Sequence, residues 1–320
     1  MKEAEAVGRH RIEELDYLKC LLIVLMISFH LVYIGESYPY AKQVVYTFHM
    51  PVFLVLSGYL MNVGKTAGKY LHTLLFYFIP YVVMESGYTV MASMLPIREH
   101  IDNLTVGVFF EKLLLHPLGP YWYLHTLVIC GLAYFGVFRL WTSFSSISRM
   151  ILLGLVYTLL ALGCDVISLT MAFYFLAGVV IRHSGLSILQ VFRPSWLALV
   201  AFVLLALFPS NLQASAPGGI LMCYLFVSFA LASYPLVGFV CRRPLLFVGR
   251  NTLSLLLFSP IFTILCKPLV SVLSFDPTGI IFLVVSLVIC ISGSLLITFL
   301  MDLTRVSPFF FGRRRALVAY

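Results

Sequence analysis

The sequence has little charge, and acidic residues are the scarcest part of it. Only 11% of its 320 residues are charged, with 13 Asp and Glu against 21 Lys and Arg, whereas 61% are hydrophobic. A soluble domain carries about a quarter charged residues. The composition therefore excludes a soluble globular protein and predicts an integral membrane protein, in agreement with a mean hydropathy of +1.02.

Paired cysteines and long polar segments are also missing. The seven cysteines are odd in number and lie in or beside apolar runs, which predicts small packing residues rather than disulfides, and no metal is expected. The longest polar stretch, residues 96–119, contains VGVFFEKLLLH, an amphipathic piece that could lie on the membrane surface. The first 16 residues are polar, and no small-residue cleavage site follows the first apolar run. That run is predicted to remain as a membrane anchor.

Long apolar runs dominate the rest of the chain. A helix needs about 20 apolar residues to cross the hydrocarbon core. This length predicts an all-α polytopic bundle of about ten transmembrane helices, of which the fifth and sixth are short. The predicted spans are 17–35, 44–62, 70–95, 120–138, 149–164, 167–182, 195–210, 217–239, 246–272 and 278–303.

Basic residues predict the orientation of these spans. With the N-terminus in the cytoplasm, all but four of the 21 Lys and Arg fall in inside segments; the exceptions are Lys42, Arg98, Lys112 and Lys267. Both termini are therefore predicted to be cytoplasmic. The chain divides into a cytoplasmic segment 1–16, a membrane domain 17–303 and a basic cytoplasmic tail 304–320. The net charge of +8 is explained by topology, so no nucleic acid partner is expected.

Four ionisable residues lie well inside predicted spans. Counted at 1.5 Å per residue, His30, His49, Glu85 and His125 all fall in the outer half of the bilayer at nearly one level. Ionisable groups at this depth are costly and usually functional. The four residues predict a wet, outward-opening cavity, although each histidine could instead be a packing residue with a satisfied hydrogen bond.

Lys19 and His30 lie on one face of the first span. The step of eleven positions from Lys19 to His30 turns the helix about 20° beyond three full turns and separates the side chains by about 16 Å along the axis. A cation at the cytoplasmic end and a base deep inside suit a long ligand that is anionic at one end. Coenzyme A matches this description, since its phosphates favour Lys or Arg. The alternative is that Lys19 is a snorkelling anchor.

Several motifs resemble the acyltransferase-3 family of integral membrane enzymes, in the family's order and over nearly the whole chain. They are LDYLKCLLIVLMISFH at the first span, FHMPVFLVLSGYLMN (48–62), GPYWYLHTLVI (119–129), VGRNTLSLLLF (248–258) and, more weakly, FYFLAGVVIR (173–182). The resemblance implies ten helices and an enzyme that moves an acyl group, commonly acetyl, from cytoplasmic acyl-CoA to a carbohydrate or related acceptor at the outer face.

The resemblance also implies roles for particular residues. His30 corresponds to the family's essential histidine, and Lys19 to its basic partner. The family tends to have two arginines at the start of its third helix; this chain has KYLH there, so Lys69 and His72 take those places and the bidentate geometry of arginine is lost. Many members have a histidine late in the penultimate helix, where the nearest residue here is Ser259.

These residues lead to a hypothesis for the site. His30 is the predicted general base on an acceptor hydroxyl, oriented by Glu85 or His49, and transfer through an acyl-histidine stays open. His125, Trp122 and Tyr123 are predicted to line the outer mouth and contact the acceptor, or else to form an interfacial aromatic belt. The candidates for acyl-CoA binding are Lys19, Lys69, His72, Arg242, Arg243 and Arg250.

Two other functions fit the same pattern. A row of intramembrane His and Glu also suits a proton-coupled transporter or flippase of a polysaccharide pathway, and a membrane scaffold in a polysaccharide complex needs the polar cluster only for helix packing. For the enzyme, we expect acyl-CoA as co-substrate, a carbohydrate or lipid-linked glycan acceptor, contact with membrane lipids, a possible homo-oligomer, and a location in the inner or plasma membrane.

Overall fold

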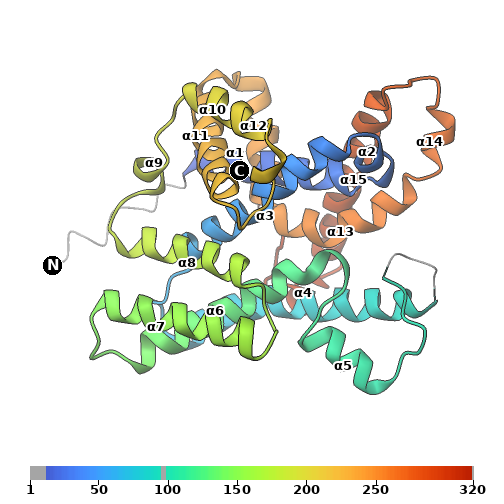
Figure 1. The fold of residues 1–320 in the computed structure, drawn as a ribbon. Helices are drawn as coiled ribbons and strands as arrows, with labels where there is room; N and C mark the ends of the chain where they lie inside the picture. Colours follow the sequence, from blue (N-terminus) through green and yellow to red (C-terminus); the bar gives the residue numbers. More distant parts are fainter. Residues whose placement is uncertain (1–11, 95–98, 319–320) are drawn as a thin grey trace.

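A computed structural model describes residues 12–94 and 99–318, and every regular element within these ranges is helical (Figure 1). Arg98 and most of the predicted segment 1–16 lie outside the described residues. The helices are α1 (Glu13–His30), α2 (Val32–Ser37), α3 (Pro39–Leu60), α4 (Ala67–Met94), α5 (Val106–Leu114), α6 (Trp122–Leu140), α7 (Ser146–Thr158), α8 (Leu169–His183), α9 (Ile188–Val191), α10 (Leu197–Ala206), α11 (Pro217–Ser233), α12 (Phe239–Arg250), α13 (Thr252–Leu265), α14 (Leu269–Val272), α15 (Ile280–Leu303) and α16 (Ser307–Phe310).

The helices pack in two groups that meet at α3. Helices α4, α6, α7 and α8 lie side by side in chain order, and α3 packs along α8 (Figure 1). On the other side of α3, helix α1 contacts α12, α13 and α15, while α10 and α11 form a pair against α3. The first helix therefore lies at the centre of the molecule, where the two groups of helices approach each other.

The predicted helical membrane bundle is confirmed, but the count of ten spans stays a prediction. Among the described residues, six helices are long and apolar enough to cross a membrane: α3, α4, α6 with its preceding turn, α7 with its following turn, α11 with its following turn, and α15. A bent pair, α12 and α13, gives a seventh if it counts as one span. The apolar helices α8 and α10 are shorter.

Two predicted spans are interrupted in the structure. The span 17–35 breaks directly after His30, because Leu31 adopts extended backbone angles before α2 begins. The span 246–272 breaks at Asn251, where α12 and α13 meet at a bend of 84°. The hydrophobic pattern could not show the break after His30, since Leu31 and Val32 continue the apolar run. The break at Asn251 coincides with the polar residues 250–252, through which the predicted span continued. The break after His30 lies beside the histidine cluster described below, and the break at Asn251 lies beside the cavity described below.

Glycine allows α3 and α8 to approach closely. A Cβ atom built on Gly178 would overlap the backbone oxygen of Val55, and one built on Gly58 would overlap that of Phe175. The two helices therefore touch through backbone at both positions, as small residues allow in membrane helices. Gly249 makes the same kind of contact between α12 and the Asp16 carbonyl of α1.

We expect Gly178→Ala to destabilise the protein by about 1–3 kcal/mol, because the added methyl group must push α8 away from α3. The measurement is thermal unfolding of the purified protein in detergent. Gly136→Ala on α6 is the matched control, since a Cβ atom there meets nothing within 4 Å. A melting temperature for Gly178→Ala equal to that of the control variant would show that the close packing is dispensable.

Candidate functional site

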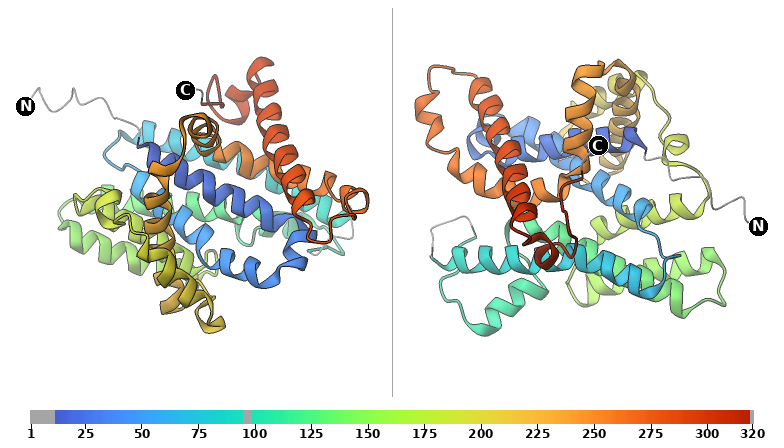
Figure 2. Two further views of the ribbon diagram at one scale, coloured as in Figure 1. Left: turned by 90° about the horizontal axis from the view of Figure 1, so that it is seen from above. Right: turned by 180° about the vertical axis from the view of Figure 1, so that it is seen from behind.

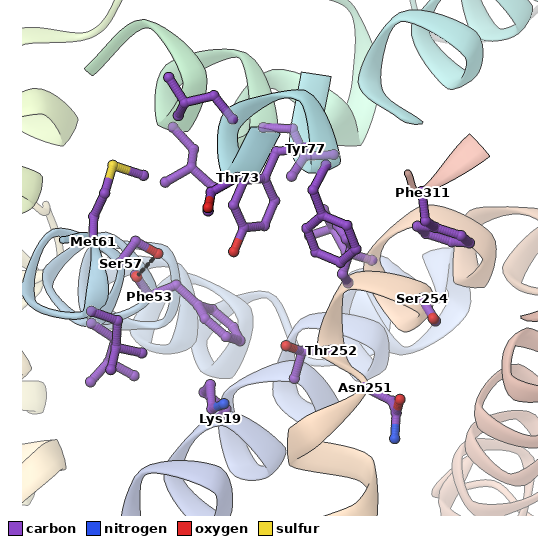
Figure 3. Close-up of a pocket in the computed structure, with 18 of the residues that line it drawn as sticks. Lys19, Phe53, Ser57, Met61, Thr73, Tyr77, Asn251, Thr252, Ser254 and Phe311 are labelled. Atoms are coloured by element: carbon purple, nitrogen blue, oxygen red, sulfur yellow. Dashed lines mark hydrogen bonds between the residues drawn. The ribbon is translucent and has the colours of Figure 1, made fainter. Parts of the chain in front are cut away.

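A cavity of about 310 Å³ lies where α1, α3, α4, α6, the α12–α13 break and the C-terminal segment converge. Figure 3 shows Phe53, Ser57 and Met61 on one side, Thr73 and Tyr77 on a second, and Lys19 on a third. Asn251, Thr252 and Ser254 from the break, and Phe311 from the C-terminal segment, complete the wall. Chain segments that are far apart in the sequence thus build one chamber.

Four cations line this cavity: Lys19, Lys65, Arg250 and Arg313. On the predicted topology, all four lie at the cytoplasmic side. Positive charge gathered around a concave surface attracts an anionic ligand, and arginine pairs well with phosphate oxygens. The cavity therefore has the charge that a phosphorylated ligand entering from the cytoplasm requires.

Asp16 holds two of these cations in place. Its carboxylate accepts from the Lys19 ammonium at 2.7 Å and from Nε of Arg250 at 3.1 Å, and the residue is only 2% exposed. Helix α1 is thereby joined to the end of α12, next to the break that lines the cavity. The buried carboxylate offsets part of the repulsion between Lys19 and Arg250, since unpaired buried charges are costly.

The deeper wall of the cavity is aromatic and hydroxylated. The Ser57 hydroxyl donates to the Phe53 carbonyl at 2.8 Å, so the Tyr123 hydroxyl, 2.7 Å away, donates to Ser57. Phe53 and Tyr77 add aromatic faces to the same space. Apolar walls with a few fixed polar groups are typical of sites that bind a small organic molecule or the arm of a cofactor.

His30 lies beyond the end of this cavity. The cavity reaches Ile23 of α1, and the next residue on the same helix face is Met26, which is 4% exposed. His30 follows one turn later on that face, as the last residue of α1. The predicted stripe from Lys19 to His30 is therefore present, and along the helix Met26 lies between Ile23 and His30 on it.

His30 and His49 form a cluster with Tyr46 and Lys42. The Tyr46 ring lies 6.0 Å from the His30 ring and 5.1 Å from the His49 ring, centroid to centroid, and the Lys42 ammonium lies 5.5 Å from the centre of the Tyr46 ring. Two of the four residues predicted at one depth are thus brought together, on α1 and α3.

Backbone hydrogen bonds define the tautomers of both histidines. Nδ1 of His30 lies 2.7 Å from the Met26 carbonyl, and Nδ1 of His49 lies 2.8 Å from the Val45 carbonyl. A carbonyl can only accept, so each Nδ1 carries a hydrogen and each neutral ring presents Nε2 as an acceptor. This is the protonation that a general base needs.

A second, outer pocket of about 280 Å³ opens beside this cluster. Lys42, Gln43, Tyr46 and Thr47 line it from α3, with Leu212 and Ala214 opposite. Lys42 and Tyr46 belong both to the pocket and to the histidine cluster. On the predicted topology, this pocket faces the outer side.

Glu85 and His125 occupy a different polar cluster. Oε1 of Glu85 accepts from the Leu118 amide at 2.6 Å, and Nε2 of His125 donates to the Leu114 carbonyl at 2.8 Å. His125 therefore bonds to the backbone at the end of α5, and Glu85 to the segment that connects α5 to α6. The near-equal depth predicted for the four residues does not make them one cluster, because depth says nothing about position around the bundle.

The predicted acceptor aromatics are separated as well. Tyr123 lies in the cation-lined cavity and not in the outer pocket, and Trp122 is half-buried beside it, with ring centroids 6.4 Å apart. The predicted role of Trp122, Tyr123 and His125 in acceptor binding stays a prediction.

Of the six predicted cofactor residues, Lys19 and Arg250 line the cavity. Lys69 and His72 are exposed on the first turns of α4, and His72 lies against Gly312 of the C-terminal segment. Arg243 stacks on Phe239, and Arg242 binds Glu13 at 2.7 Å. The Tyr234 hydroxyl and then Arg242 lower the pKa of Glu13, so this pair ties α12 to α1 away from the cavity.

Several cavity residues were not singled out by the sequence. In the sequence, Lys65 and Arg313 count only as basic residues that indicate topology. Asp16, which binds two of the cavity's cations, belongs there to the polar N-terminal segment. Asp16 precedes Lys19 by three residues, a spacing that places opposite charges together on a helix.

In residues 12–94 and 99–318, no group of three or more His, Cys, Asp or Glu side chains is placed to hold a metal ion.

We expect Asp16→Asn to destabilise the fold by about 3–5 kcal/mol, because it leaves two cations without their buried counter-charge. Thermal unfolding in detergent measures this effect. The double variant Asp16→Asn/Arg250→Met is expected to recover part of the loss, since it removes one of the two repelling cations. An unchanged melting temperature in Asp16→Asn would mean that the bridge does not stabilise α1 against α12.

Comparison with known proteins gives a family match over residues 12–299, to the model described as "Acyltransferase domain" of the acyltransferase-3 type. No match was found among curated proteins or among solved structures. The matched region contains α1 to α14 and all but the last turn of α15. The chain therefore belongs to the acyltransferase-3 family of membrane acyltransferases.

Proposed function

We propose that the protein is an O-acyltransferase of the cell membrane that moves an acyl group, expected to be acetyl, from cytoplasmic acyl-CoA to a hydroxyl of a cell-surface or lipid-linked carbohydrate. Family membership supports the acyltransferase activity. The observation that carries the finer proposal is the single face of α1 that joins a cation-lined cavity to a histidine with a free Nε2.

The cation-lined cavity is proposed to hold the acyl-CoA. Its volume of about 310 Å³ suits an extended pantetheine arm, which leaves the phosphorylated nucleotide at the cationic mouth. Lys19, Lys65, Arg250 and Arg313 offset the phosphate charge. The hydroxyls of Ser57 and Tyr123 are positioned to contact the amide groups of the arm, and the thioester end points along α1 toward Met26.

The outer pocket is proposed to hold the acceptor. The Tyr46 ring offers an aromatic face, and Gln43 and Thr47 offer hydrogen-bonding groups, a combination that suits a sugar. The same ring lies beside His30 and His49, so a hydroxyl bound there approaches the imidazoles from the side opposite the cation-lined cavity.

The proposed chemistry uses the lone pair of His30 Nε2. Nε2 takes the proton of the acceptor hydroxyl while the hydroxyl oxygen forms a bond to the thioester carbonyl carbon. The carbon–sulfur bond then breaks, and the thiolate of CoA receives the proton from the imidazolium. The products are an ester and free CoA, and no other reactant is needed. Transfer through an acyl-histidine, in which Nε2 itself attacks the thioester, has the same overall balance.

In this proposal, the Met26 carbonyl orients the imidazole, as the aspartate carboxylate does in a Ser-His-Asp triad. It holds Nδ1–H at 2.7 Å and so keeps Nε2 available. His49 is oriented in the same way, and its ring also lies beside Tyr46, 5.1 Å away between centroids. Glu85 keeps a structural role in this arrangement, since its carboxylate is bonded to the Leu118 amide.

Met26 follows Ile23 on this face of α1, and in this proposal its side chain must move for thioester and imidazole to meet. A methionine side chain is flexible and can repack at small cost. We expect Met26→Ala to raise kcat for acetyl-CoA hydrolysis several-fold, because a shorter side chain leaves the path open. Steady-state release of CoA by the purified protein measures this. Unchanged kcat and KM would place Met26 off the path.

The central test is His30→Ala. We expect label transfer from radiolabelled acetyl-CoA, and hydrolysis of it, to fall by about 10²–10⁴-fold, the usual contribution of a positioned acid or base. Binding of CoA, measured by calorimetry, should persist, because His30 lies outside the cation-lined cavity.

His100→Ala, at an exposed loop position, is the matched control and should retain activity. Full turnover in His30→Ala would contradict the proposal. A protein that exports an unmodified glycan with no dependence on acyl-CoA would instead be a transporter.

A further inference from the structure

The C-terminal segment that follows α15 completes the cation-lined cavity, although it lies beyond the matched residues 12–299. Its residues Phe311, Arg313, Ala316 and Val318 line the cavity. Figure 2 shows this segment running from the end of α15 past α4 and back toward the α12–α13 break. The cavity is therefore not built by the family-matched region alone.

Two polar side chains fasten this segment. The Asp302 carboxylate, at the end of α15, accepts from the Ser307 hydroxyl, from the Ala316 amide at 2.7 Å and from the Leu317 amide at 3.0 Å. At the other side, the Asn251 side chain accepts from the Val318 amide at 2.8 Å and donates to its carbonyl at 3.2 Å. The segment thus forms a fixed wall rather than a loose tail, and Arg313 lies between Ser307 and Ala316, which both bind Asp302.

Arg313 is held in position by a different kind of contact from the other three cations of the cavity. Lys19 and Arg250 are bound to Asp16, and the Lys65 ammonium donates to the Thr73 hydroxyl at 3.2 Å. The Arg313 guanidinium stacks over the Phe76 ring, 3.8 Å from its centre, and makes no ion pair with the side chains of residues 12–94 and 99–318. A guanidinium stacked in this way is fixed in position while its N–H groups stay available.

We propose that Arg313 is a phosphate-binding residue for the donor nucleotide, a role that rests on the proposed acyl-CoA-dependent function. A stacked guanidinium presents two parallel N–H groups that match two oxygens of one phosphate. The stack on Phe76 holds the guanidinium at the cavity wall, and in this role Arg313 selects for a phosphorylated carrier over an unphosphorylated thioester. The neighbouring residues Arg314 and Arg315 are exposed and do not line the cavity.

The adjacent arginines give a closely matched test. Arg313→Gln and Arg314→Gln remove the same charge one residue apart, from exposed positions that the fold tolerates. Calorimetry in detergent measures the affinity for CoA. A competition assay against acetyl-CoA measures the affinity for S-acetylpantetheine, which lacks the nucleotide and its phosphates. We expect Arg313→Gln to weaken CoA binding about tenfold, a typical loss for one charge-assisted contact, with S-acetylpantetheine unaffected. Arg314→Gln should bind CoA as the wild type does.

The outcomes separate this inference from the proposed function. If the wild type binds and turns over acetyl-CoA but Arg313→Gln binds CoA normally, only the role of Arg313 fails. Equal weakening in Arg313→Gln and Arg314→Gln would show a diffuse field rather than a phosphate contact. Equal weakening for S-acetylpantetheine would show a general change of the cavity wall. If the wild type binds no CoA at all, both proposals fail.

Arg313→Lys adds a second readout. It keeps the charge and loses the planar fork, so we expect CoA affinity between those of the wild type and Arg313→Gln. An affinity for Arg313→Lys as low as that of Arg313→Gln would also fit a contact that needs the fork, whereas full wild-type affinity would show that only charge matters and would overturn the bidentate contact.

Discussion

The buried carboxylate of Asp16 is the interaction on which the site depends. It binds Lys19 on its own helix and Arg250 at the end of α12, and so joins two elements that lie more than 200 residues apart in the chain. Gly249 lets the two backbones touch at the same place. The contact fixes the bend at Asn251, and the bend in turn supplies one wall of the cavity and one attachment of the C-terminal segment.

One face of α1 then organises the chemistry in the proposed mechanism. Lys19 and Ile23 face the cation-lined cavity, Met26 follows them on the same face, and His30 lies at the end of the helix beside Tyr46 of the outer pocket. An enzyme that joins a cytoplasmic donor to an outer acceptor must keep the two compartments separate while it brings the donor thioester and the acceptor hydroxyl together. A single helix with a buried methionine between its cation and its base meets both requirements without a continuous pore across the membrane.

Much of the fold followed from composition and periodicity, since charge is excluded from a bilayer core and basic residues mark its inner side. The relation between Lys19 and His30 also followed, because a helix fixes the angle between residues eleven apart. The clustering of His30 with Glu85 did not, because the sequence gives depth and not position around the bundle; Glu85 binds the Leu118 amide instead. The break after His30 was hidden because apolar residues continue past it, whereas the break at Asn251 coincides with a short polar stretch, residues 250–252.

The sequence by itself determined a helical membrane bundle, a cation and a base on one helical face, and the family's motifs, since these depend on local spacing and hydrophobicity. Tertiary structure alone decided which cations share a cavity, that Tyr123 lines that cavity, and that the C-terminal segment with Arg313 forms one of its walls. These facts depend on how helices pack and on hydrogen bonds between distant residues, such as those of Asp302 and Asn251. No periodicity along the chain records such contacts, because they join segments whose order in the sequence is unrelated to their distance in space.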